Sequence, residues 1–133
     1  MPGYKYVDTN ILIRIGEGKE EYIKWLQTKE EKDEKMMVAS IVMTEVIWVL
    51  KSFYKKNREE INQFVDSIVA TRCLQLRSKH DIKKALELYK QSGIKFTDCL
   101  IASYMKVEDV IYSDDLDFEK LGVKRREIRA DQD

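Results

Sequence analysis

Short β-favouring runs alternate with amphipathic helical segments along the chain, and no other feature constrains the fold as much. The runs predict strands at residues 4–7, 36–39, 73–76 and 110–112, with an edge strand over 123–128. Helical spacing predicts helices over 19–31, 40–53, 57–71, 80–91 and 97–106, and a short helical turn over 117–121. Such alternation forms βαβ units, so we expect one α/β domain over residues 1–133 with three layers: a short, mostly parallel sheet of about four to five strands between two layers of helices.

Local signals mark several helix ends. Asn57 followed by Glu60 forms a capping-box pattern, in which each side chain accepts a hydrogen bond from the backbone N–H of the other residue. Ser40 is a typical N-cap residue at the start of the second predicted helix. Gly93 follows the fourth predicted helix and suits a left-handed helix end.

Length and composition limit the function classes that are open to the chain. Its 133 residues fit one domain, and the longest wholly apolar stretch, 46–50, is far shorter than the roughly 20 residues that span a bilayer. We expect neither export nor membrane insertion, and two cysteines without metal-ligand spacing suit a reducing cytoplasm. The 24 basic and 24 acidic side chains cancel, so no overall basic field marks a nucleic-acid binder. Because His80 is the single histidine, the sequence gives little support for a zinc site or for a histidine-dependent catalytic triad.

Several acidic side chains occupy positions where a carboxylate is costly or where ligands gather. Glu45 has apolar residues three and four positions away on both sides, so it projects from an apolar helix face. Asp98 opens a helix that is apolar nearly all round, where an unpaired charge needs a partner. Asp8 and the segment 113–115 follow two predicted strands, whose carboxyl ends share one edge of a parallel sheet. Carboxylate oxygens gathered there predict a site for a hard cation such as Mg²⁺ or Mn²⁺.

Each acid taken singly also has a purely structural explanation. An Asp after a strand is commonly a turn or cap residue, which would account for Asp8. Asp98 in a first helical turn is favoured by the unpaired N–H groups there. Asp114, Asp115 and Asp117 also suit a solvated acidic loop. The metal-site interpretation depends on finding acids at strand ends and on apolar helix faces together.

Four blocks of the chain, in this order and spacing, resemble the PIN-domain nucleases: 6–12 (YVDTNIL), 44–46 (TEV), 96–102 (FTDCLIA) and 113–118 (SDDLDF). The resemblance covers essentially the whole chain, and the small size is most similar to VapC-type toxins, the ribonuclease half of toxin–antitoxin pairs. It implies a PIN-like α/β/α fold and an endoribonuclease that hydrolyses RNA with Mg²⁺ or Mn²⁺. It also implies a homodimer and inhibition by a small antitoxin protein.

The resemblance implies roles for individual residues of these blocks. The catalytic and metal-binding quartet of the family maps to Asp8, Glu45, Asp98 and Asp115. The residues that map to supporting positions around the metal are Thr9, Asn10, Ser113 and Asp117. Asn10 is expected to hydrogen-bond an acid or a metal-bound water. The last block of the family commonly reads Thr or Ser, any residue, Asp, any residue, Asp-Phe, which favours Asp115 over Asp114 as the fourth acid and leaves that choice open.

Other functions share parts of this pattern. A PIN fold without catalysis would serve as a scaffold in an RNA-processing assembly. A receiver-like signalling domain also gathers aspartates and Mg²⁺ at strand ends, but it leaves Glu45 and Asp98 unexplained. Basic clusters at 51–58 and 124–129 are interpreted as solvated faces, and aromatic side chains such as Trp25, Trp48 and Phe53 as core or interface residues.

Overall fold

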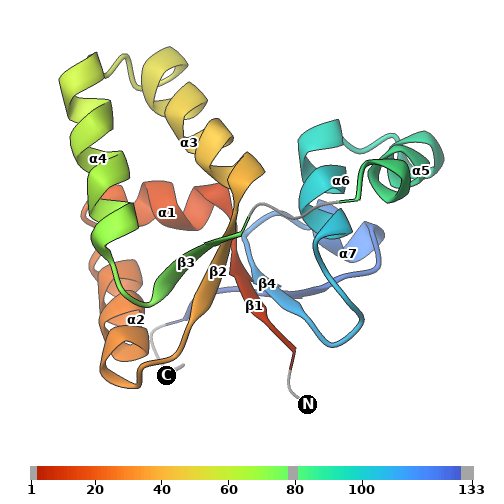
Figure 1. Cartoon of the computed structure of the whole chain (residues 1–133), viewed down its shortest axis with the longest axis horizontal. Helices are drawn as coiled ribbons and strands as arrows, with labels where there is room; N and C mark the ends of the chain where they lie inside the picture. Colours follow the sequence, from red (N-terminus) through yellow and green to blue (C-terminus); the bar gives the residue numbers. More distant parts are fainter. Residues whose placement is uncertain (1–2, 78–80, 130–133) are drawn as a thin grey trace.

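The computed structural model describes residues 3–77 and 81–129, and at its centre lies a five-stranded sheet in which every pairing is parallel (Figure 1). The strands are β1 (Lys5–Val7), β2 (Met36–Ala39), β3 (Leu74–Arg77), β4 (Val110–Tyr112) and β5 (Lys124–Arg126). Their order across the sheet is β3-β2-β1-β4-β5. The chain therefore adds β2 and β3 on one side of β1 and β4 and β5 on the other. In parallel sheets, ligands bind at such a reversal, outside the carboxyl ends of the strands.

The register places the ends of β1 and β4 next to each other at this reversal point. Tyr6 lies opposite Met37 of β2 on one side and opposite Ile111 of β4 on the other. The backbone N–H of Asp8 extends the second pairing by donating to the carbonyl oxygen of Tyr112 at 3.0 Å. Residues that follow β1 and β4 in the sequence are thus neighbours in space.

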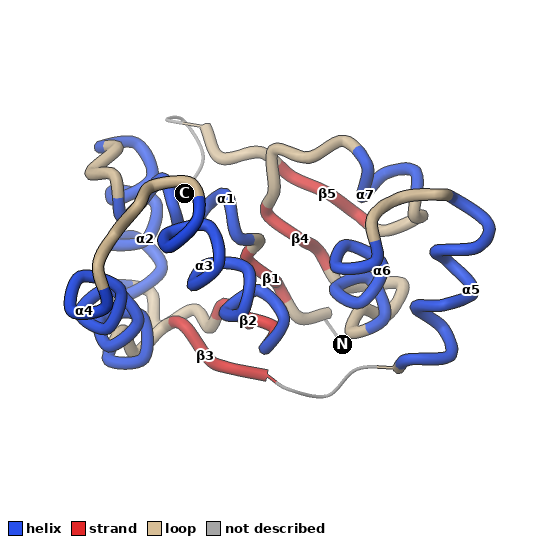
Figure 2. Tube along the Cα trace, turned by 90° about the horizontal axis from the view of Figure 1, so that it is seen from above, coloured by secondary structure: helices blue, strands red, loops and turns tan. Residues whose placement is uncertain are grey.

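Helices cover both faces of the sheet (Figure 2). One side carries α1 (Thr9–Gly16), α2 (Glu20–Glu31), α3 (Ser40–Ser52) and α4 (Arg58–Ala70), and the other carries α5 (Ile82–Ser92), α6 (Phe96–Ser103) and α7 (Asp117–Lys120). Although α3 and α6 belong to different layers, they contact each other. This contact brings side chains from both layers to one end of the sheet.

The core is centred on the middle strands. Val7, Val38 and Ile111 come from three neighbouring strands, and each is at most 1% exposed. Strands that are covered on both faces carry apolar side chains on both, which accounts for the unbroken apolar run of β2. Ile11 of α1 and Ile101 of α6 are completely buried and close the two faces of the sheet. The end of the sheet where α3 and α6 meet therefore rests on a well-packed core.

The structure confirms the predicted fold class and several local signals. Both hydrogen bonds of the capping box are present: Glu60 N donates to Asn57 Oδ1 at 2.8 Å, and Asn57 N donates to Glu60 Oε1 at 3.0 Å. Gly93 ends α5 with a φ of 70°, in the left-handed region that favours glycine. Among the helices in the described part of the chain, none reaches the length and apolarity that a bilayer crossing requires.

Two local predictions are wrong. Ala39, not Ser40, is the N-cap of α3, and the Ser40 hydroxyl instead lies 2.8 Å from that of Tyr104. The helix expected over 97–106 ends at Ser103, because the N–H of Lys106 bonds Asp109 Oδ2 at 2.7 Å in the turn that leads into β4. The sequence analysis also delimited no helix before residue 19, whereas α1 begins directly after Asp8. His80, expected at a helix start, lies outside the described residues.

Candidate active site

A cleft of about 320 Å³ opens at the reversal point of the sheet, between α1, α3 and α6. The four acids expected to form the quartet all line this cleft: Asp8, Glu45, Asp98 and Asp115. Thr9 and Asn10 line it as well. Four separate parts of the chain thus contribute carboxylates to one place.

Asp8 is the N-cap of α1, and three hydrogen bonds fix its carboxyl group. Oδ1 accepts from the N–H of Thr9 at 2.7 Å, while Oδ2 accepts from the Ser113 hydroxyl at 2.6 Å and the Asn10 amide at 3.2 Å. The residue is 4% exposed, and burial raises the pKa of Asp8 to about 6 even though the Ser113 and Thr9 hydrogen bonds lower it. Asn10 and Ser113 therefore orient Asp8.

Glu45 enters the cleft from the middle of α3. Its Oε1 accepts a hydrogen bond from the Thr9 hydroxyl at 3.1 Å, and its Oε2 lies 3.6 Å from Lys95 Nζ. Lys95 is the N-cap of α6, so the basic partner comes from the opposite helical layer. The sequence analysis did not identify Lys95, and the signal that could have found it is its position three residues before Asp98.

Asp98 is the most deeply buried of the four acids, with 2% of its surface exposed. Oδ1 lies 3.9 Å from Lys95 Nζ, whereas Oδ2 is buried and has no hydrogen-bond partner among the described residues. Burial raises the pKa of Asp98 to about 8; Lys95 opposes this rise, and Asp8 and Asp115 add to it. A buried carboxylate oxygen without a partner costs free energy, so the site favours a cation from outside the protein.

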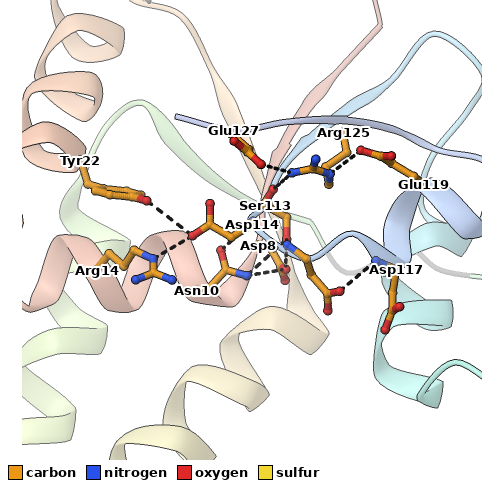
Figure 3. Close-up of polar contacts among 11 residues, drawn as sticks. Asp8, Asn10, Arg14, Tyr22, Ser113, Asp114, Asp117, Glu119, Arg125 and Glu127 are labelled. Carbon is orange, nitrogen blue, oxygen red and sulfur yellow. Dashed lines mark hydrogen bonds and ion pairs between the residues drawn. The ribbon is translucent and has the colours of Figure 1, made fainter. Parts of the chain in front are cut away.

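The turn after β4 gives its two aspartates different partners. Asp114 Oδ2 pairs with Arg14 Nε at 2.9 Å and accepts from the Tyr22 hydroxyl at 3.5 Å (Figure 3). Asp115 lines the cleft, and its N–H donates to the Ser113 hydroxyl at 3.0 Å. Asp114 is thus held by a guanidinium outside the acid cluster, and the geometry favours Asp115 as the fourth acid.

The carboxylates of Asp98, Asp115 and Asp117 have the spacing of a metal site. Each offers one oxygen, and these three oxygens lie within 4.8 Å of one another. Hard divalent cations bind carboxylate oxygens at about 2.0–2.6 Å, so oxygens at this separation can share one ion. With the unpartnered Oδ2 of Asp98, this donor set fits a divalent cation.

Arg125 of β5 supports the turn that carries Ser113 and Asp115. Its Nη1 donates to the carbonyl oxygen of Ser113 at 2.9 Å, and its Nε pairs with Glu119 Oε2 at 2.8 Å (Figure 3). The side chain is only 9% exposed. The interpretation of residues 124–129 as a solvated basic face is therefore wrong for Arg125, because its guanidinium is used inside the protein.

Replacing Arg125 with Met should lower turnover about 10- to 100-fold, the usual effect of losing a group that supports a metal ligand. Loss of the bonds to Ser113 and Glu119 should also lower the free energy of unfolding by about 1–3 kcal/mol. Steady-state kinetics at saturating metal and urea denaturation measure the two effects. Arg126→Met, an exposed neighbour on the same strand, should leave both unchanged. Equal activity of the two variants would contradict the role assigned to Arg125.

The aromatic side chains divide between core and surface. Trp25 is 3% exposed and packs against Tyr112, with 5.0 Å between ring centroids. Trp48 and Phe53 on the α3 side are 64% and 74% exposed. Phe53 also lines the cleft, together with the ring of Tyr54. The acids thus share their cleft with an exposed aromatic surface.

Comparisons with known proteins agree with this geometry. The model of the PIN domain family matches residues 5–124. A VapC ribonuclease from Aquifex aeolicus (strain VF5) is 31% identical over 127 residues, which cover 90% of this chain and 93% of that protein. Among solved structures, VapBC2 from Rickettsia felis bound to a DNA fragment from its promoter superposes with a TM-score of 0.70 at 18% identity, covering 95% of this chain and 99% of that chain. DNA-bound VapBC from Salmonella typhimurium gives a TM-score of 0.69 at 17% identity, covering 97% and 100%. At such identities, the two structures establish a likeness of fold.

Proposed function

Because the chain belongs to the PIN-domain family, we propose that it is a metal-dependent endoribonuclease and the toxin of a toxin–antitoxin pair. One observation carries the proposal: Asp98 Oδ2 is buried without a partner in the described part of the chain, and its carboxyl lies in a cluster with Asp115 and Asp117. Asp8 and Glu45 line the same cleft. A non-catalytic scaffold would have no need for an unsatisfied acid at this place.

Mg²⁺ or Mn²⁺ bound to these carboxylates would lower the pKa of a bound water and offset charge on the phosphate that is cleaved. The chain itself supplies orientation. Ser113 and Asn10 hold Asp8, and Thr9 holds one oxygen of Glu45, so the carboxylates keep their directions before a ligand arrives. Catalytic groups that are fixed in advance need little reorganisation during the reaction.

The electrostatics of the cleft favour RNA only when cations are present. Five acidic residues line it against two basic ones, Arg14 and Lys95, and this excess of carboxylates repels a phosphodiester backbone until positive charge is added. Phe53 and Tyr54 at the cleft provide aromatic faces on which a base of a single strand can stack. We therefore expect single-stranded or looped RNA as the substrate class.

Partners are proposed on the basis of the relatives. The similar structures from Rickettsia felis and Salmonella typhimurium are VapBC assemblies, and we propose a small antitoxin protein for this chain as well. A homodimer and a cytoplasmic location complete the proposal. The exposed rings of Trp48 on α3 and of Phe53 directly after it support a protein interface, because large exposed apolar side chains mark interaction surfaces where they gather.

The direct test is cleavage of labelled transfer RNA, ribosomal RNA and unstructured oligomers by the purified, antitoxin-free protein. With Mg²⁺ or Mn²⁺ we expect cleavage of at least one RNA, and with EDTA we expect none, because the acids need a bound cation. Readdition of metal should restore cleavage. Cleavage that persists in EDTA would contradict metal dependence, and a complete absence of cleavage over the panel would favour the non-catalytic scaffold.

A further inference from the structure

Lys95 holds a fixed position between two of the acids. Its backbone is the N-cap of α6, where its carbonyl oxygen accepts from the N–H of Asp98 at 3.1 Å. Its Nζ lies 3.6 Å from Glu45 Oε2 and 3.9 Å from Asp98 Oδ1. A lysine ammonium ordinarily carries its charge near neutral pH, so Lys95 places a cation between the two carboxylates.

The carboxylate oxygens fall into two groups around Asp98. On one side, Asp98, Asp115 and Asp117 offer oxygens within 4.8 Å of one another, and Asp98 Oδ2 has no partner within residues 3–77 and 81–129. On the other side, both oxygens of Glu45 already have partners, the hydroxyl of Thr9 and the ammonium of Lys95. In the first group, Asp117 Oδ1 has the largely exposed Lys120 Nζ at 3.6 Å, but Asp98 Oδ2 is left open to a cation; in the second group, no oxygen of Glu45 is left open.

We propose that Lys95 takes the place of a second divalent cation, so that the site binds a single metal ion on the side of Asp98, Asp115 and Asp117. This inference rests on the proposed function and deepens it. In sites with two metals, the ions lie about 3.5–4 Å apart and share the bridging carboxylates. Here the ammonium of Lys95 lies between Glu45 and Asp98, two of the carboxylates that would hold a second ion if one were bound.

A lysine at this position supplies charge without requiring a second ion from solution. Its three N–H donors can turn toward a phosphate oxygen, and its side chain is 60% exposed and therefore accessible from the cleft. The lysine would position the phosphate opposite the metal ion. Because Lys95 provides one of the two positive charges, metal binding should saturate at one ion per chain.

Counting Mn²⁺ ions tests the proposal without a substrate. Isothermal titration calorimetry and Mn²⁺ electron paramagnetic resonance on the whole protein should give one ion per chain. In Lys95→Met, Glu45 and Asp98 lose the ammonium, and we expect two ions per chain. Lys95→Arg keeps the charge and should return the count to one. Lys90→Met, on an exposed lysine of α5, is the matched control and should also bind one ion.

Kinetics give a second readout. The dependence of RNA cleavage on Mn²⁺ should have a Hill coefficient near one in the wild-type protein and near two in Lys95→Met. Two ions on the wild-type protein, or one ion on a folded Lys95→Met variant, would overturn the role of Lys95 and leave the nuclease proposal intact. No Mn²⁺ on the wild-type protein would instead overturn the metal site itself. Where Lys95→Met fails to fold, Lys95→Gln provides the same removal of charge with a polar side chain and should likewise bind two ions.

Discussion

Replacing Asp98 with Asn should lower RNA cleavage by more than about 100-fold, because loss of a supporting group alone costs about 10- to 100-fold and Asp98 is expected to contact the metal directly. The amide keeps the shape of the side chain but removes the charge that binds the cation. Single-turnover cleavage assays at saturating Mn²⁺ measure the effect. Cleavage by Asp98→Asn at the wild-type rate would remove Asp98 from the site.

The same variant should be at least as stable as the wild-type protein when no metal is bound. Burial raises the pKa of Asp98 from its ordinary value of 3.8 to about 8 in the folded state. The folded protein therefore holds a proton that the unfolded chain releases, and stability falls as the pH rises from about 4 to about 8. Asn does not titrate, so the free energy of unfolding of the variant does not fall for this reason between pH 4 and pH 8.

Chemical denaturation in EDTA at pH 4 and pH 8 separates this effect from catalysis. The difference in free energy of unfolding between Asp98→Asn and the wild-type protein should be small at pH 4 and should favour the variant at pH 8. Added Mn²⁺ should stabilise the wild-type protein and leave the variant nearly unchanged, because binding to the folded state alone raises stability. A variant that is less stable than the wild-type protein at pH 8 in EDTA would contradict the conclusion that the buried, unpartnered carboxylate of Asp98 destabilises the metal-free protein.

Two neighbouring substitutions distinguish the aspartates after β4. Asp115→Asn should lower cleavage by more than about 100-fold, because Asp115 lies in the cleft and in the cluster with Asp98 and Asp117. Asp114→Asn should lower it by less than about threefold, because Asp114 pairs with Arg14 outside the cluster and a half-buried pair that solvent still screens contributes little. Both variants are assayed side by side for cleavage and for Mn²⁺ affinity. The reverse order of effects would transfer the fourth position of the quartet to Asp114.

The periodicity of the sequence was sufficient to predict most of the fold. Strands β2 and β4 have the predicted bounds, because short apolar runs between helical segments leave few alternatives. The capping box at Asn57 was also predictable, since it depends only on residues three positions apart. The role of Ser40 was not predictable from the sequence, because its hydroxyl makes a tertiary contact with Tyr104 and does not cap the helix.

The sequence indicated the acidic residues of the candidate site but not the basic side chains that contact them or support them. The four acids occur in blocks that a resemblance can identify, and the structure brings all four to one cleft. Lys95 meets Glu45 only because α3 and α6 touch, and no local spacing relates those two residues. In the sequence, Arg125 resembles the other basic residues of an exposed segment. It contacts Ser113 only because β5 pairs with β4. Long side chains that reach across elements depend on tertiary packing and leave little trace in a local pattern.

The pairing of β1 with β4 also governs when the protein becomes active during its synthesis. Asp8 emerges early from the ribosome, but its partner Ser113 is 105 residues further along the chain. Until β4 has been translated and has docked, one edge of β1 is bare and Asp8 lacks the hydroxyl that orients it. Incomplete translation products therefore carry acids without an assembled site. A cell that makes this chain meets its chemistry only after the residues from Asp8 to Ser113 have all been translated, which leaves that time of elongation for an inhibitor to be present.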